Sequence, residues 1–319
     1  MSAVFTALSE SNHPEDEEHL ARLLWLEERR KGVGASEVAA ILGLDPWKTA
    51  LGVWASKVHG DETIDSEVME IGRELEEPGA RMFARRFPDL VVQDPGMYTI
   101  RRHRNAPLFA TCDRDLETRG PAHENDRGVL EIKASSKTDE WTGGPPLRYV
   151  CQVQAQLAVT GRTWGYLAAL LGGRKFVAHR IERDDAFIDA MLDKVREFWS
   201  LVESKTEPDA TKPFDLSVVK LLHPKDSGTT IEADAAGEAF VAAWESATKA
   251  KREAEESHKL TEAALRQHVG DATWMALPDG RKVQAKVEPR KAECCKQCGG
   301  IVREASEPRV LRVVKAGRK

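Results

Sequence analysis

The feature that most constrains the fold is a repeated change in the spacing of apolar residues. Apolar side chains recur at helical spacing in residues 66–86, whereas from Val91 to Lys133 they form short alternating runs separated by Pro, Gly and Asp/Asn. These runs predict β-strands. Helical spacing returns at 146–159 and at 184–202, on either side of Gly172-Gly173, a strong two-residue hairpin signal. This order of elements predicts an α/β domain built on a sheet.

Composition outside this pattern divides the chain into four segments. Residues 1–19 are acidic and without periodicity, and we expect them to be disordered. The sheet domain covers residues 20–205, and the Pro-, Asp- and Ser-containing residues 206–230 form an expected linker. Residues 231–319 begin with an Ala- and Glu-rich helix, about Ala235 to Val269, whose narrow apolar stripe is typical of a coiled-coil-like arm. A basic tail follows this helical arm.

The charge is distributed unevenly along the chain. The net charge is −5, but residues 275–319 contain 12 Lys/Arg and 5 Asp/Glu, which suits contact with a phosphate backbone. A solvated basic end is an equally good interpretation. We expect no membrane span and no secretory signal. Five unevenly spaced cysteines indicate a reducing, cytoplasmic compartment rather than a disulfide framework.

Two acids and a lysine form the motif that carries chemistry. Glu131 and Lys133 lie two residues apart on a predicted strand and so share a face, while Ile132 faces the opposite layer. If Asp113 ends the preceding strand, both carboxylates and the amine meet at one sheet edge. Carboxylate oxygens suit Mg²⁺, Lys133 could position or deprotonate the attacking water, and the backbone carbonyl of Ile132 could add a ligand. Alone, this motif also fits a strand with a polar, solvent-facing side.

Two further polar positions strengthen the catalytic interpretation. Glu76, on the helix of residues 66–86, could add a metal ligand, although it could equally be one exposed acid among several. Gln152 and Gln156 lie one helical turn apart in an otherwise apolar helix. Amides are costly to bury unless they have a partner such as a phosphate or a bound water. A solvent-facing Gln stripe is the alternative.

Taken together, these residues resemble the YqaJ-type viral recombinase family, which is similar to the lambda exonuclease branch of the PD-(D/E)xK nuclease superfamily. The resemblance runs in unbroken order over about residues 20–205. It rests on Arg30 to Val38, Ile41 to Leu44, Pro46-Trp47-Lys48, Gly72 with Leu75-Glu76, Asp113-Arg114, Gly128 to Lys133, Gln152-Val153-Gln154, Val159-Thr160-Gly161 before Trp164, and Ile181 to Asp184.

The resemblance implies a PD-(D/E)xK, restriction-endonuclease-like core with a central mixed β-sheet flanked by helices. It implies Glu76, Asp113, Glu131 and the Ile132 carbonyl as metal ligands, Lys133 as the catalytic lysine and Gln152 as a supporting residue. Asp115 is a less favoured alternative to Asp113. In the exonuclease branch an Arg and a Ser hold the 5′-phosphate, which points to Ser36 and to either Arg30 or Arg29 here. We also expect Ser36 to cap the helix of residues 37–42.

The implied activity is Mg²⁺- or Mn²⁺-dependent exonuclease action on double-stranded DNA ends, 5′-to-3′, in the cytoplasm of a bacterial or phage-infected cell. A single-strand annealing protein is the implied partner, and some relatives form trimers. One alternative is a structure- or site-specific endonuclease on the same fold. Another is a non-catalytic DNA-end-binding scaffold for an annealing protein.

Two further features leave their roles open. Cys294, Cys295 and Cys298 lie close together, but a zinc site commonly takes four ligands from two such groups, so a reduced basic turn is the favoured interpretation. Trp141, in a Gly/Pro-flanked loop after the Glu131 strand, is a candidate base-stacking side chain.

Overall fold

A computed structural model describes residues 14–60, 67–96, 98–120, 126–288, 293–294, 301–303 and 309–314, with the side chains of 14–20, 293–294, 301–303 and 309 left out. The chain divides into two compact units, Met1–Asp226 and Ser227–Lys319. None of the described helices is long and apolar enough to cross a membrane. The expected disorder of residues 1–19 falls largely outside the described residues, although helix already begins at Pro14.

The first unit is organised by a five-stranded mixed sheet in the order β2-β5-β6-β7-β8. The pairs β2/β5, β5/β6 and β7/β8 are antiparallel, whereas β6 and β7 are parallel because helix α7 crosses between them. The strands are β2 (Leu90–Gln93), β5 (Arg114–Thr118), β6 (Arg127–Ser135), β7 (Trp164–Leu171) and β8 (Lys175–Glu182).

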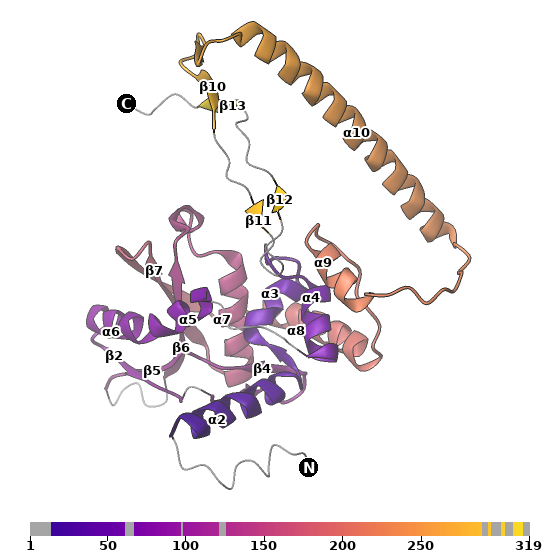
Figure 1. The fold of residues 1–319 in the computed structure, drawn as a ribbon. Coiled ribbons are helices and arrows are strands. Elements are labelled where there is room, and N and C mark those ends of the chain that lie inside the picture. Colours follow the sequence, from indigo (N-terminus) through magenta and orange to yellow (C-terminus); the bar gives the residue numbers. More distant parts are fainter. Residues whose placement is uncertain are drawn as a thin grey trace. The chain divides into compact units, whose positions relative to one another are not determined.

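Helices cover the sheet on both sides (Figure 1). Helix α6 (Glu76–Arg86) packs its buried Phe83 against Leu130 and Ile132 of β6 in a small apolar cluster. Helix α7 (Leu147–Thr160) lies on the other side, where Val129 and Leu167 belong to the main core. The expected α/β architecture, a central mixed β-sheet flanked by helices, is confirmed.

Most of the remaining elements of the first unit pack on the α7 side, whereas α5 contacts α6. A second, three-stranded sheet has the order β1-β4-β3, with β1 and β4 parallel. Helix α8 presents the regular apolar stripe expected from the sequence, including buried Ile188, Met191 and Val195. These elements are β1 (Val33–Gly34), β3 (Arg101–Arg102), β4 (Leu108–Ala110), the 3-10 helices η1 (Ala35–Glu37) and η3 (Thr138–Trp141), and α2 (Pro14–Arg29), α3 (Val38–Ile41), α4 (Ala50–His59), α5 (Glu67–Glu74), α8 (Asp185–Glu203) and α9 (Asp215–Leu222).

The second unit contains the long helix α10 (Ala235–Val269) and short strands. Strands β9 (Trp274–Ala276), β10 (Lys282–Val287) and β13 (Arg309–Val314) pair as an antiparallel sheet in the order β13-β10-β9. Strands β11 (Glu293–Cys294) and β12 (Ile301–Arg303) form a separate antiparallel pair. The helix expected from about Ala235 to Val269 is therefore confirmed.

Several local expectations differ from the structure. The helix expected over 66–86 is broken at Leu75 into α5 and α6. Residues 206–230 were expected to be a linker, but they contain α9. Its Asp215 is fully buried and accepts hydrogen bonds from the Thr49 hydroxyl (2.6 Å) and from the Thr211 amide (2.8 Å). These bonds tie the segment to the start of α4.

Candidate active site

Strand β6 places its polar side chains under helix α7. Ile132 belongs to the apolar cluster on the α6 side, so the alternation of the strand sends Glu131 and Lys133 to the α7 side. Glu131 is only 1% exposed, which requires strong compensating interactions for a carboxylate. The predicted shared face of Glu131 and Lys133 is confirmed by their direct contact, 2.5 Å between Oε1 and Nζ.

Two amides from α7 complete the surroundings of Glu131. Gln152 donates its Nε2 hydrogen bond to Oε1 at 2.7 Å, and Gln156 donates to Oε2 at 2.6 Å. Both glutamines are buried. The buried partner that the sequence required for these amides is therefore the Glu131 carboxylate itself. Gln156, which the resemblance does not single out, holds Glu131 as directly as Gln152, and the four-residue spacing was its signal.

Asp113 lies immediately before β5 and meets β6 beside Glu131. Its Oδ2 accepts a hydrogen bond from the Ile132 amide at 2.7 Å. Burial, and after it the charges of Glu131 and Glu76, raise the pKa of the Asp113 carboxyl well above its usual range. Burial and Glu131 likewise raise the pKa of Glu76. The three carboxyls from α6, the β5 edge and β6 therefore repel one another within one site.

Lys133 is the cation that faces this group of acids. Burial alone would lower its pKa, but the charges of Glu131 and Asp113 outweigh that effect and raise it above the usual range. Its Nζ also lies 5.2 Å from the centre of the Tyr149 ring on α7. In this arrangement Lys133 is a protonated, positioned cation rather than a free base, which favours the charge-neutralising role among those considered from the sequence.

A glycine allows α6 to bring Glu76 close to the sheet. A Cβ built on Gly79 would lie 2.6 Å from Cγ2 of Ile132, a distance that real Cβ contacts do not reach. Gly79 lies one helical turn after Glu76, at the start of α6. Close packing of α6 on β6 therefore depends on the missing side chain, and this packing sets the position of Glu76.

Asp115 is held in a different network from Asp113. Arg101 binds it with two nitrogens, at 2.8 and 2.6 Å, and Arg162 donates a third hydrogen bond at 2.6 Å. Although burial would raise the pKa of Asp115, these arginines lower it. The Asp115 carboxylate thus connects β5 with Arg101 of β3 and with Arg162 before β7, and its engagement favours Asp113 as the candidate ligand.

The donor set suits a hard divalent cation in type and in charge. Glu76, Asp113 and Glu131 offer carboxylate oxygens, and the like charges that raise the pKa values of Glu76 and Asp113 are those that a cation neutralises. Within the described residues, no three acidic, His or Cys side chains already stand close enough together to hold a metal ion.

The expected 5′-phosphate residues lie around η1. Ser36 is exposed within η1, but it caps no helix, which corrects the expectation: Gly34 precedes η1, and its amide donates to the Glu37 carboxylate at 2.8 Å. Glu37 is buried and pairs with Lys57 at 2.7 Å. The Arg29 guanidinium also interacts electrostatically with the Glu37 carboxylate. The Arg30 guanidinium lies beside Gly60.

Trp141 does not have the exposure that base stacking requires. It is 6% exposed and stacks between Tyr149, with ring centres 5.8 Å apart, and His179, at 6.3 Å. The expectation for Trp141 is therefore wrong, because η3 folds the loop inward. Cys294 lies in β11 without a described side chain, and Cys295 and Cys298 fall outside the described residues.

Two of the solved structures that are similar to this chain are described as exonucleases. An alkaline exonuclease (LHK-Exo) from Laribacter hongkongensis, also solved in complex with dAMP, is 25% identical, with a TM-score of 0.48 over 62% of this chain and 98% of that one. A phage related exonuclease from Haemophilus somnus 129PT is 15% identical, with a TM-score of 0.42 over 55% of this chain and 96% of that one.

Sequence comparisons agree with the resemblance described above. The uncharacterized protein YqaJ of Bacillus subtilis (strain 168) is 34% identical over 189 residues, which are 57% of this chain and 56% of that protein. The chain thus spans just over half the length of this relative. The family model of the YqaJ-like viral recombinase domain matches residues 24–163, a range that contains Glu76, Asp113, Glu131, Lys133 and both α7 glutamines. Residues 24–163 are therefore similar to the YqaJ-like viral recombinase domain.

Proposed function

We propose that this protein is a metal-dependent deoxyribonuclease that acts as an exonuclease on linear duplex DNA in homologous recombination. The observation that carries the proposal is the buried Glu131, held by two amides and Lys133, with two further carboxyls of raised pKa beside it. Burial of mutually repelling acids is costly, and such clusters are typical of functional sites. The similarity of residues 24–163 to the YqaJ-like viral recombinase domain supports a role in recombination.

Each residue of the site has a distinct task in the proposal. Glu76, Asp113 and Glu131, with the Ile132 carbonyl, hold Mg²⁺ or Mn²⁺, which supplies an activated water and charge stabilisation for phosphodiester hydrolysis. Gln152 and Gln156 fix the Glu131 oxygens, so that the carboxylate does not rotate away.

Lys133 acts on the reacting phosphate as a fixed positive charge. Its contact with Glu131 keeps the ammonium protonated, so it stabilises negative charge that builds on the phosphate oxygens. Its place against the Tyr149 ring limits the directions in which the side chain can turn.

The resemblance also motivates finer proposals on substrate and setting. The enzyme digests the 5′-ended strand, with Ser36 and Arg30 (or Arg29) at the 5′-phosphate. It works in the cytoplasm, hands the exposed strand to a single-strand annealing protein, and assembles as a homo-oligomer, a trimer by resemblance.

Digestion of matched duplexes tests this function. Linear duplexes with and without a 5′-phosphate, and a closed circular duplex, are incubated with the full chain in Mg²⁺ or in a chelator. We expect mononucleotide release from the linear duplexes only, dependence on Mg²⁺, and faster release when the 5′-phosphate is present.

Other patterns of product would separate the alternatives. Cutting of the closed circle would support an endonuclease on the same fold. Tight binding of DNA ends without any product in Mg²⁺ or Mn²⁺ would support a binding scaffold and contradict the proposed hydrolysis.

A further inference from the structure

An exposed tryptophan lies on the loop that leads into α4. Trp47 is 53% exposed, in contrast to the buried Trp141. The loop is fixed by Asp45, whose Oδ1 accepts hydrogen bonds from the amides of Trp47 (2.7 Å) and Lys48 (3.0 Å). The backbone therefore holds the half-exposed aromatic ring in a defined place.

Two cations lie over the Trp47 ring. The Lys137 Nζ is 4.4 Å from the ring centre, and the Arg148 guanidinium carbon is 4.6 Å from it. Both contact the carboxylate of Glu140, and Arg148 is the main cause of the lowered pKa of Glu140. Two positive groups facing one carboxylate leave a surplus of positive charge beside the ring.

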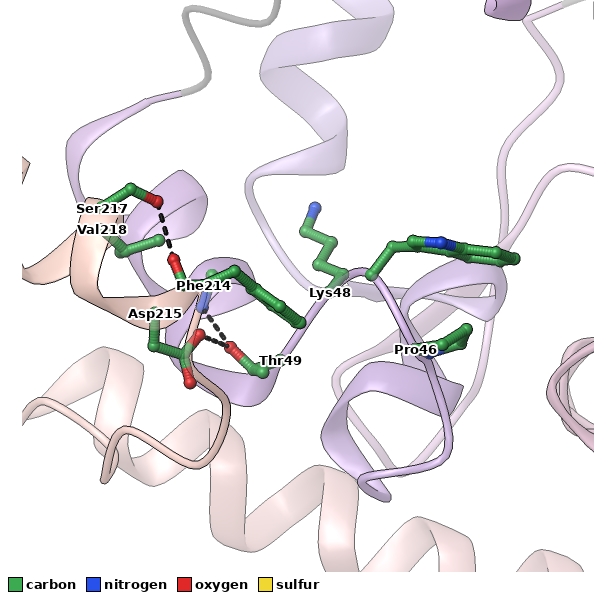
Figure 2. Close-up of a pocket in the computed structure, with 9 residues that line it drawn as sticks. Pro46, Lys48, Thr49, Phe214, Asp215, Ser217 and Val218 are labelled. Atoms are coloured by element: carbon green, nitrogen blue, oxygen red, sulfur yellow. Dashed lines mark hydrogen bonds between the residues drawn. The ribbon is translucent and has the colours of Figure 1, made fainter. Parts of the chain in front are cut away.

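A cleft of about 470 Å³ opens next to Trp47, and neither Lys137 nor Arg148 lines it. Figure 2 shows walls from two separate segments, the loop before α4 and the start of α9. The lining is mostly apolar, and the buried Asp215 in its wall is engaged by Thr49 and by backbone amides. The lining residues are Pro46, Trp47, Lys48, Thr49, Gly52, Phe214, Asp215, Ser217 and Val218.

A chain of side-chain contacts connects Trp47 to the candidate active site. Arg148 lies over Trp47 and also over Tyr149, 4.4 Å from that ring centre. Tyr149 in turn lies under the Lys133 ammonium, which pairs with Glu131. Cations and aromatic rings thus lie next to one another from the proposed site of hydrolysis to the cleft, and a single nucleic-acid strand offers phosphates to such cations and base faces to such rings.

We propose that the cleft beside Trp47 binds an unstacked base of a DNA strand whose neighbouring phosphates lie at Lys137 and Arg148. The strand continues past Tyr149 toward Lys133. This inference rests on the proposed function, since it takes the strand to be the one that is hydrolysed. The base lies against the side of the Trp47 ring that lines the cleft, and the apolar wall around Phe214 and Val218 shields it from water. Such a site is tolerant of sequence, because every base offers an aromatic face.

Binding of short oligonucleotides by the full chain in a chelator tests this site apart from hydrolysis. A labelled single strand is compared with a strand of the same length made of abasic nucleotides. The variants are Trp47→Ala, Trp47→Phe and, as the matched control, Trp244→Ala on α10, where the ring is 70% exposed. Unfolding midpoints establish that all variants are folded.

We expect Trp47→Ala to weaken binding of the normal strand by about 5- to 150-fold, which corresponds to the loss of one base stack. Trp47→Phe keeps most of the affinity, and Trp244→Ala keeps all of it. The abasic strand binds wild type and Trp47→Ala equally. Lys137→Ala weakens both strands alike and lowers the salt dependence by about one phosphate contact.

Unchanged binding of the normal strand by Trp47→Ala would overturn the proposal, as would an equal loss for the abasic strand. Because these measurements exclude metal, they separate the two proposals. Trp47-dependent binding by a wild-type protein that never hydrolyses DNA would contradict the proposed function alone. Hydrolysis by the wild type with binding that is indifferent to Trp47 would contradict the base site alone.

Discussion

The two faces of strand β6 are packed in opposite ways, although consecutive residues alternate between them. On the α6 side, Ile132 fits against a glycine with no room for one more carbon. On the α7 side, Glu131 is equally buried but is held by two amides and an ammonium. On the α6 face the available volume restricts which side chains fit, and on the α7 face the buried charges do. A substitution on the first face therefore measures the cost of overpacking, and one on the second measures the cost of burying charge.

Addition of one methyl group tests the close packing on the apolar face. Gly79→Ala places a Cβ 2.6 Å from Ile132 Cγ2, and overpacking of this kind costs about 1–3 kcal/mol. Gly72→Ala is the matched control, because a Cβ there meets nothing within 4 Å and gains about 1 kcal/mol of helix propensity. We expect the unfolding free energies of the two variants to differ by about 1–3 kcal/mol, with Gly79→Ala the less stable, in denaturant titrations. Equal stabilities would contradict close packing of α6 on β6.

Removal of one charge tests the electrostatic repulsion on the polar face. Because burial, Glu131 and Glu76 raise the pKa of Asp113 in the folded protein, its ionisation opposes folding. Asp113→Asn keeps an acceptor for the Ile132 amide, and we expect it to stabilise the metal-free protein by about 0.5–2 kcal/mol at neutral pH while hydrolysis is lost.

The pH dependence of the stability gained by Asp113→Asn follows from the direction in which the Asp113 pKa is shifted. The gain is complete above the raised folded pKa and disappears as pH falls toward the ordinary value of 3.8, since wild type then also carries a neutral group. Denaturation in a chelator across this range measures it. A constant difference at all pH values, or a less stable Asp113→Asn, would contradict the repulsion among the three carboxyls.

The sequence predicted the regular elements well, because their signals are local. The Gly172-Gly173 hairpin has the positive φ angles (56° and 68°) that its glycines suggested, and α8 and α10 follow their apolar stripes. The prediction that residues 206–230 form a linker missed α9. This helix is held by a hydrogen bond from the Thr49 hydroxyl to Asp215, 166 residues away, and no local sequence pattern reveals such a contact.

For the candidate site, strand alternation predicted that Glu131 and Lys133 lie on one face of their strand. Helical spacing predicted that Gln152 and Gln156 lie on one face of their helix. That the glutamines hold Glu131 depends on how α7 crosses the sheet, which is a tertiary property. The expectation that Trp141 stacks on a base was wrong for a related reason. Its burial against Tyr149 and His179 depends on the folded chain, which the loop sequence does not reveal.

The most direct test of the account is the effect of Glu131→Gln on release of nucleotides from linear duplex DNA in Mg²⁺. Gln is preferred to Ala here because Ala would leave two buried amides and Lys133 without their partner. Glu197→Gln, the same change on the exposed face of α8, is the control. The account predicts a folded Glu131→Gln protein with activity lowered by a factor of about 10³ or more, and full activity in the control. Wild-type rates in a folded Glu131→Gln protein would contradict it.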